Sequence, residues 1–195
     1  MRASTTDHGH PTGEVPVLNI ANVLTVLRVV LVPVFVVFFF ISDAQDPWWR
    51  AGAFVVFALA MATDWVDGYL ARKLGLVTDF GKIADPIADK ALIAAAMISL
   101  SLFGELFWWV TFLILVREVG ITLWRLFGVD YVVAAGKGGK LKTVTQTVGL
   151  GMLILPLPHW VWPIEWAVIG VALVLTVYTG IDYLVKARRA ARAER

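Results

Sequence analysis

Long apolar blocks dominate this sequence of 195 residues and restrict it to one class of fold. Hydrophobic residues make up 59% of the chain, and the mean hydropathy is +0.77. The apolar residues form blocks about as long as the roughly 20 residues that a helix needs to cross a bilayer. Because lipid cannot satisfy backbone polar groups, such segments must form all their hydrogen bonds internally. We therefore predict an all-α, polytopic membrane protein.

Hydropathy predicts about six transmembrane helices in one membrane domain, residues 19–187. The predicted spans are 21–41, 49–74, 82–103, 105–127, 140–155 and 164–186. A polar N-terminal tail, 1–18, lacks the pattern of a cleaved signal, and a basic C-terminal tail occupies 188–195. We interpret His8 and His10 as ordinary tail residues, because two histidines in a polar tail are weak evidence for a metal site.

The charges predict the orientation of the chain. Basic residues collect in alternate connections and at the C-terminus: Arg72, Lys73, Lys82, Lys137, Lys140, Lys142, Lys186, Arg188, Arg189, Arg192 and Arg195. The opposite connections carry acids, with Arg50 as their cation, and most of the tryptophans. The positive-inside rule then puts both termini on the cytoplasmic side of the inner membrane, with an aromatic belt at the other side.

Four aspartates lie in and beside two of the apolar blocks. Asp64 and Asp67 are three residues apart and share a helix face, and Asp85 and Asp89 are four apart at the start of the next helix. Acids at membrane depth are costly and usually mark a functional site. Since four like charges repel one another, we predict that they hold one or two divalent cations through carboxylate oxygens. The alternative is a set of interfacial acids that cap helix ends.

The residues around the aspartates favour a site for a charged ligand. Gly68, one turn after Asp64, leaves room for a ligand to approach the backbone. Ala71 keeps the same stripe small, and Arg72 offers a planar cation for a phosphate or carboxylate. Cysteine is absent, which excludes disulfides and thiolate chemistry. No nucleic-acid partner is predicted.

The run D-x2-D-G-x2-A-R-x8-G-x3-D-x3-D, from Asp64 to Asp89, resembles the signature of the CDP-alcohol phosphatidyltransferases. The resemblance implies a homodimeric membrane enzyme with six transmembrane helices and Mg²⁺ or Mn²⁺, in which an alcohol displaces CMP from a CDP-linked lipid. It implies that Asp89 is also the general base toward the acceptor hydroxyl. The implied metal ligands are Asp64, Asp67, Asp85 and Asp89. The implied contacts of the CDP-lipid are Asp64, Gly68, Ala71, Arg72 and Thr25.

The chemistry agrees with these residue types. A divalent ion can neutralise the negative charge that develops on the departing CMP while it polarises the phosphoryl centre. A carboxylate at Asp89 can accept the proton of the attacking hydroxyl if that hydroxyl comes within hydrogen-bond reach.

Three further segments narrow the resemblance within the family. These are the stretch 19–28, the run Arg117-Glu118-Val119-Gly120 with Arg125, and the stretch 139–146. Together they resemble the bacterial phosphatidylglycerophosphate synthases, whose substrates are CDP-diacylglycerol and sn-glycerol 3-phosphate. The likeness covers about 19–146. Ala21 departs from an expected proline, a difference that we expect to affect the helix start and not the chemistry.

A phosphorylated acceptor needs cations in its pocket. Arg117 and Arg125 lie in an apolar stretch and are about 80° apart on a helix, and Lys140 and Lys142 could reach the same pocket from the next helix. We predict that these four bind the acceptor phosphate. The alternatives are a buried pairing of the arginines with Glu118 and a role of the lysines as membrane anchors.

The remaining polar residues of these segments do not receive a single role from the sequence. Asn22 and Arg28 are further candidates, and Arg28 is equally well a site residue or the structural partner of an aspartate. Lys73, Lys82 and Lys90 are interpreted as interfacial. The basic tail is predicted to attract anionic membrane lipids.

The sequence leaves two kinds of alternative function: an enzyme of the same family with a different acceptor, and a transporter. Arg117, Arg125 and Lys142 favour a phosphomonoester acceptor, which argues against a cardiolipin synthase. They do not separate glycerol phosphate from inositol phosphate, so a phosphatidylinositol phosphate synthase is the alternative. A cation-coupled transporter would usually have broken helices and paired repeats, and the sequence has no visible repeat.

Overall fold

The computed structural model describes the backbone over residues 20–41, 46–74, 79–127 and 137–193. Side chains are described over 23–41, 46–66, 87–123 and 139–186.

Helices make up nearly all of the described chain, and no strand occurs in it. They are α1 (Ile20–Ile41), α2 (Pro47–Leu74), α3 (Asp79–Leu102), α4 (Trp108–Phe127), α5 (Lys137–Ile154), the 3₁₀ turn η1 (His159–Val161) and α6 (Trp162–Ala193). The predicted all-α architecture is confirmed. By length and composition, helices α1, α2 and α6 can each span a membrane. The count of six spans stays a prediction.

The helix ends differ from the predicted ones by three or more residues in four places, one of them the start of α5 at Lys137 and not at residue 140. Helix α3 begins at Asp79, so Gly81 lies inside the helix and not in the connection before it. Helix α4 begins at Trp108 and not at residue 105, because Gly104 has a positive φ of 74° and the next two amides donate back to the Leu100 carbonyl. Helix α6 runs on to Ala193, so the first part of the predicted tail is helical.

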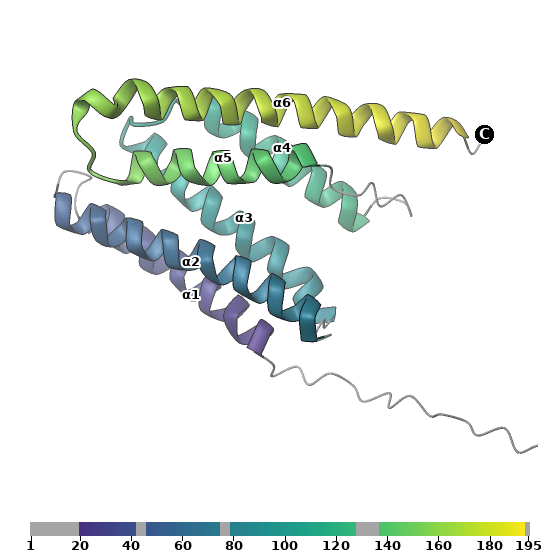
Figure 1. Ribbon diagram of the computed structural model, residues 1–195, viewed down its shortest axis with the longest axis horizontal. Helices are drawn as coiled ribbons and strands as arrows, with labels where there is room; N and C mark the ends of the chain where they lie inside the picture. The colour runs from purple at the N-terminus through teal and green to yellow at the C-terminus, as the bar shows by residue number, and fades with distance from the viewer. Residues whose placement is uncertain (1–19, 42–45, 75–78, 128–136, 194–195) are drawn as a thin grey trace, which may run out of the picture.

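The helices form an antiparallel bundle in which both ends of the described chain lie at the same side (Figure 1). The ends of α2, α4 and α6 and the starts of α1, α3 and α5 lie at that side. We call it the aspartate end, because Asp64 and Asp89 lie in the halves of α2 and α3 nearer to it. The other side is the tryptophan end, where α2, α4 and α6 begin with their tryptophans.

Two glycines let neighbouring helices pack closely. A Cβ added to Gly52 of α2 would come within 2.7 Å of the Phe38 ring on α1. One added to Gly149 of α5 would come within 2.8 Å of the Ile169 side chain on α6. Small residues at such contacts are the usual means of helix association in membranes, where burial of apolar surface from lipid contributes little.

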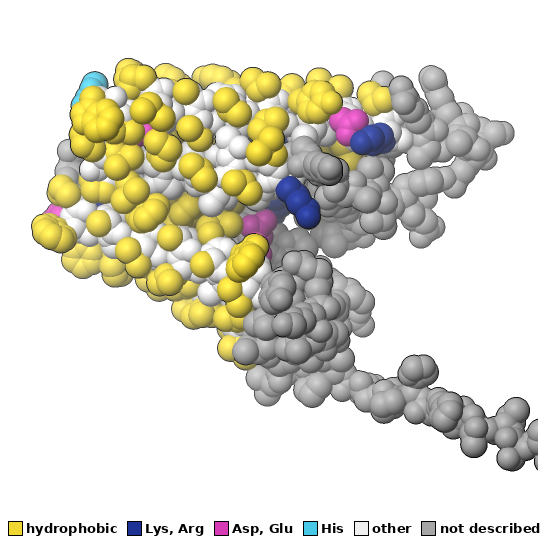
Figure 2. Space-filling view, in the orientation of Figure 1, with side chains coloured by type: hydrophobic (Ala, Val, Ile, Leu, Met, Phe, Trp, Pro, Cys, Tyr) yellow, Lys and Arg dark blue, Asp and Glu magenta, His cyan; other side chains and the backbone are white. Residues whose placement is uncertain are grey.

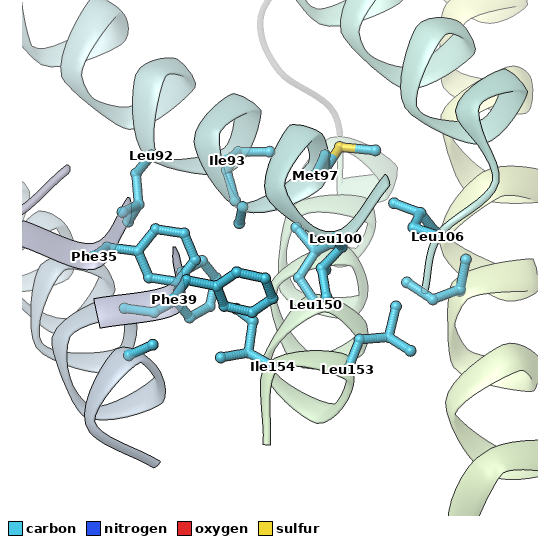
Figure 3. Close-up of a cluster of buried hydrophobic side chains, with 14 of the residues drawn as sticks. Phe35, Phe39, Leu92, Ile93, Met97, Leu100, Leu106, Leu150, Leu153 and Ile154 are labelled. Atoms are coloured by element: carbon cyan, nitrogen blue, oxygen red, sulfur yellow. The ribbon is translucent and has the colours of Figure 1, made fainter. Parts of the chain in front are cut away.

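Apolar side chains fill the centre of the bundle and also cover its outside. The central cluster includes Phe35 and Phe39 of α1, Leu92 and Met97 of α3, and Leu150 of α5 (Figure 3). Hydrophobic side chains are spread over the whole described face seen in Figure 2, and the Lys and Arg side chains on that face lie toward the aspartate end. An apolar exterior around an apolar core is expected of a bundle that is surrounded by lipid.

Candidate active site

Arg28 reaches from α1 to the first aspartate of the motif. Its Nη1 lies 3.0 Å from Asp64 Oδ1. The Arg28 side chain is fully buried, whereas Asp64 keeps 39% of its side chain exposed. Thr25 lies one turn earlier on the same helix face and is also buried. Of the two roles open for Arg28, the geometry therefore gives it a direct ionic contact with an aspartate of the motif.

Asp89, the predicted general base, lies beside a lysine. Lys90 Nζ is 3.7 Å from Asp89 Oδ2, and 21% of the Asp89 side chain is exposed. The same ammonium group also contacts the Glu118 carboxylate on α4. Lys90, interpreted from the sequence as interfacial, thus connects the predicted base to a second cluster of charges.

Glu118 is the centre of that second cluster. Its carboxylate is buried and contacts three cations from three helices: Lys90 of α3, Arg117 of α4 and Lys142 of α5. Arg117 Nη1 donates to Glu118 Oε1 at 2.8 Å. One carboxylate neutralises one of the three cations, which leaves a net charge of about +2 among these side chains. We call these four residues the cation cluster.

Helix α6 is tied to the cation cluster through Arg117. Its Nη2 donates to Thr179 Oγ1 at 2.9 Å, and Thr179 in turn bonds back to the Leu175 carbonyl. The Arg117 stem packs on Gly180, where an added Cβ would lie 3.5 Å from Arg117 Cγ. Side chains from four helices therefore meet at one point near the aspartate end.

The four predicted acceptor residues have three different outcomes in the structure. Arg117 and Lys142 both belong to the cation cluster. Lys140 is exposed, and no contact with the cluster is found for it among the described residues. Arg125 lies in the last turn of α4, and its side chain is outside the described residues.

For several other predicted site residues the structure describes the backbone but not the side chain. They are Asn22 in α1, Asp67, Gly68, Ala71 and Arg72 in α2, and Asp85 in α3. The predicted convergence of four carboxylates is therefore untested by the described side chains. The two that are described fit a divalent cation, because each is a hard oxygen donor that is still partly exposed.

Sequence comparisons identify the family to which the chain belongs. The family model of the CDP-alcohol phosphatidyltransferases matches residues 18–178. That match includes both helices that carry the motif, α2 and α3, and about the first half of α6. The chain belongs to the CDP-alcohol phosphatidyltransferase family.

Relatives within the CDP-alcohol phosphatidyltransferase family cover most of the chain. A probable phosphatidylglycerophosphate synthase of Mycobacterium tuberculosis (strain H37Rv) is 46% identical over 182 residues, 93% of this chain and 87% of the relative. The CDP-diacylglycerol–glycerol-3-phosphate 3-phosphatidyltransferase of Bacillus subtilis (strain 168) is 37% identical over 86% of this chain and 94% of its own length. The enzyme of that name from Salmonella typhimurium (strain LT2) is 38% identical over 87% and 95%.

Sequence reasoning missed the central position of Glu118 and the contact of Lys90. The sequence suggested Glu118, the one acid of α4, as a partner for the arginines alone, yet its carboxylate contacts two lysines as well. One signal was available: an acid in an apolar helix must find compensation, and one arginine beside it on the same helix is a poor means of burying it. The partners on α3 and α5 depend on helix packing, which the sequence does not specify.

Proposed function

We propose that this chain transfers the phosphatidyl group of CDP-diacylglycerol to sn-glycerol 3-phosphate and releases CMP, as a phosphatidylglycerophosphate synthase. The observation that carries the proposal is the cation cluster, with a net charge of about +2, beside Asp89. Relatives at 37–46% identity carry the corresponding names.

The charge of the cation cluster fits a phosphomonoester. A phosphate of this kind has its second pKa near 6 and carries a charge close to −2 at pH 7. A phosphodiester, as in a phosphatidylglycerol acceptor, carries only one negative charge. Because charges near the bilayer are weakly screened by water, the closer match should favour the phosphomonoester acceptor.

The residues then take complementary parts in the transfer. The acceptor hydroxyl oxygen forms a bond to the phosphatidyl phosphorus, the bond from that phosphorus to the CMP oxygen breaks, and Asp89 accepts the hydroxyl proton. Asp64, Asp67, Asp85 and Asp89 would hold Mg²⁺ or Mn²⁺, which supplies charge neutralisation at the departing CMP. Arg28 would hold Asp64 in position, and Arg117 and Lys142 would bind the acceptor phosphate.

We further propose that the protein lies in the inner membrane with its aspartate end at the cytoplasmic side. Phosphorylated alcohols are dissolved in the cytoplasm, and the headgroups of CDP-linked lipids are accessible from it. The basic starts and ends of helices at this end support that orientation. A homodimer is proposed from the family resemblance.

The direct test is an assay of purified protein with CDP-diacylglycerol and Mg²⁺. Glycerol 3-phosphate, inositol 3-phosphate and phosphatidylglycerol are supplied separately, and CMP release and the lipid product are measured. We expect CMP release with glycerol 3-phosphate. Turnover with inositol 3-phosphate or phosphatidylglycerol in its place would overturn the choice of acceptor, and liposome cation flux without CMP release would overturn the enzyme class.

A further inference from the structure

A buried acid at the centre of a phosphate pocket needs an explanation, because it repels the ligand that the pocket binds. Only 5% of the Glu118 side chain is exposed, and its two oxygens share three cations. A carboxylate of this kind could compete with the phosphate for the cations, or it could hold the cations in place for it.

The geometry favours the second role. Lys142 has only 4% of its side chain exposed, and Lys90 has 30%. Without an anion, two ammonium groups and a guanidinium from three helices would repel one another in a poorly solvated place. A shared carboxylate fixes their positions before the acceptor arrives, and such preorganisation reduces the cost of binding.

Lys90 extends this arrangement to the reacting group. It is next to Asp89 in the chain, its Nζ is 3.7 Å from Asp89 Oδ2, and it also contacts Glu118. The phosphate of the acceptor and the hydroxyl that reacts are separated by a fixed number of bonds. A side chain that contacts both the cation cluster and the base can therefore fix the distance between the two ends of the acceptor.

We propose that Glu118 is a positioning residue that holds Lys90, Arg117 and Lys142 as one phosphate-binding unit, and that Lys90 is an acceptor-binding residue that aligns this unit with Asp89. The inference rests on the proposed function, because it requires an acceptor that carries a phosphate. It goes beyond that function in assigning roles to Glu118 and Lys90 that the family signature does not contain.

The test compares Glu118→Gln with the wild type in full-length, Mg²⁺-supplied protein. The glutamine keeps the shape and removes the charge. We expect the KM for glycerol 3-phosphate to rise about tenfold or more, while the KM for CDP-diacylglycerol changes less than about twofold. The inhibition constant of inorganic phosphate against the acceptor should rise in parallel. Equal changes in both KM values, no change, or a fall in the acceptor KM would overturn the positioning role.

Lys90→Met keeps the test open if Glu118→Gln does not fold, because Glu118 then still has Arg117 and Lys142. We expect a higher acceptor KM and a lower kcat, with recovery of most of both in Lys90→Arg. In an Asp89→Asn background, Lys90→Met should lower kcat no further. A Lys90→Met enzyme with both constants at wild-type values would overturn the assignment of Lys90.

Asp182→Asn is the matched control, since it breaks the exposed ion pair of Asp182 and Lys186 on α6, whose side chains are 46% and 49% exposed. Its two KM values should stay at the wild-type values. If the wild type uses a different phosphorylated alcohol, the proposed function fails, and the same comparison with that alcohol still tests the inference. If the wild type uses only an acceptor without a phosphomonoester, both fail.

Discussion

Arg28 is a charged residue that the fold buries completely, and it forms an ionic contact with Asp64 of α2, an acid that is itself accessible. Burying a guanidinium removes it from water at a large cost in free energy, and ionic contacts such as the one to Asp64 must offset that cost. The arginine orients one carboxylate oxygen and leaves the exposed part of that carboxylate for a ligand. It thereby supports the motif from outside the run of residues that defines it.

Replacing Arg28 by methionine should therefore impair the proposed metal site without removing any of its predicted ligands. Partners that orient a metal ligand typically contribute 10- to 100-fold in metal affinity, and we expect the Mg²⁺ requirement for CMP release to rise by about that factor. Titration of activity with Mg²⁺, and of Mn²⁺ binding by spectroscopy, measures it. Arg28→Lys should show a smaller effect. An unchanged Mn²⁺ affinity in folded Arg28→Met protein would contradict the orienting role.

Asp89 gives a second prediction at the residue scale. Asp89→Asn removes the proton acceptor and keeps the shape, so we expect kcat to fall by roughly 10²- to 10⁴-fold, the usual contribution of a general base. CDP-diacylglycerol binding in the presence of Mg²⁺, measured by calorimetry or a fluorescent analogue, should largely persist. Turnover close to that of the wild type would exclude Asp89 as the base.

At the scale of elements, Arg50 holds the tryptophan end together. It forms a bidentate pair with Glu105 in the turn before α4, with one bond of 2.6 Å. It also donates to the carbonyls of Leu153 and Ile154 in the last turn of α5. Those carbonyls have no partner within their own helix. One side chain of α2 therefore satisfies the end of α5 and fixes the turn between α3 and α4.

Arg50→Met should destabilise the bundle and leave its specificity unchanged. Loss of one partner from a fully buried ion pair typically costs about 3–5 kcal/mol. Because 27% of the Glu105 side chain is exposed, we expect the loss of this pair to cost less than that, with the free carbonyls adding to it. The midpoint of thermal unfolding in detergent should drop clearly, and the two KM values of the remaining folded enzyme should stay near wild type. Lys186→Met, in an exposed pair worth less than about 1 kcal/mol, is the control. A changed acceptor KM with normal stability would contradict this division between the two ends.

The sequence predicted the helices well because apolar blocks of bilayer length have few alternative folds. It failed at helix ends such as Gly104, where a single backbone conformation decides the boundary. Spacing within one helix also predicts which aspartates share a face, and this stays a prediction because the side chains of Asp67 and Asp85 lie outside the described residues. It did not predict that Lys90 and Lys142 meet on Glu118, because contacts between α3, α4 and α5 depend on how the helices rotate against one another.

For the whole molecule, the separation of charges along the bundle agrees with one orientation in the membrane. Helix α6 has 32 residues, which corresponds to about 48 Å and exceeds the roughly 30 Å of the hydrocarbon core. The surplus lies toward its basic C-terminal end, at the aspartate end of the bundle (Figure 1). The tryptophan end has no comparable basic extension within the described residues.

This asymmetry predicts which residues a reagent outside the cell can reach, and the absence of cysteine makes the measurement direct. His159→Cys introduces one thiol at the exposed tryptophan end, and Lys186→Cys introduces one at the exposed end of α6. If the positive-inside rule holds for this chain, a membrane-impermeant maleimide should label the first variant in intact spheroplasts and the second only after permeabilisation. CMP release by both variants would establish that they are correctly folded. The reverse labelling pattern would put the cation cluster on the side that lacks cytoplasmic acceptors, and the proposed orientation would then be wrong.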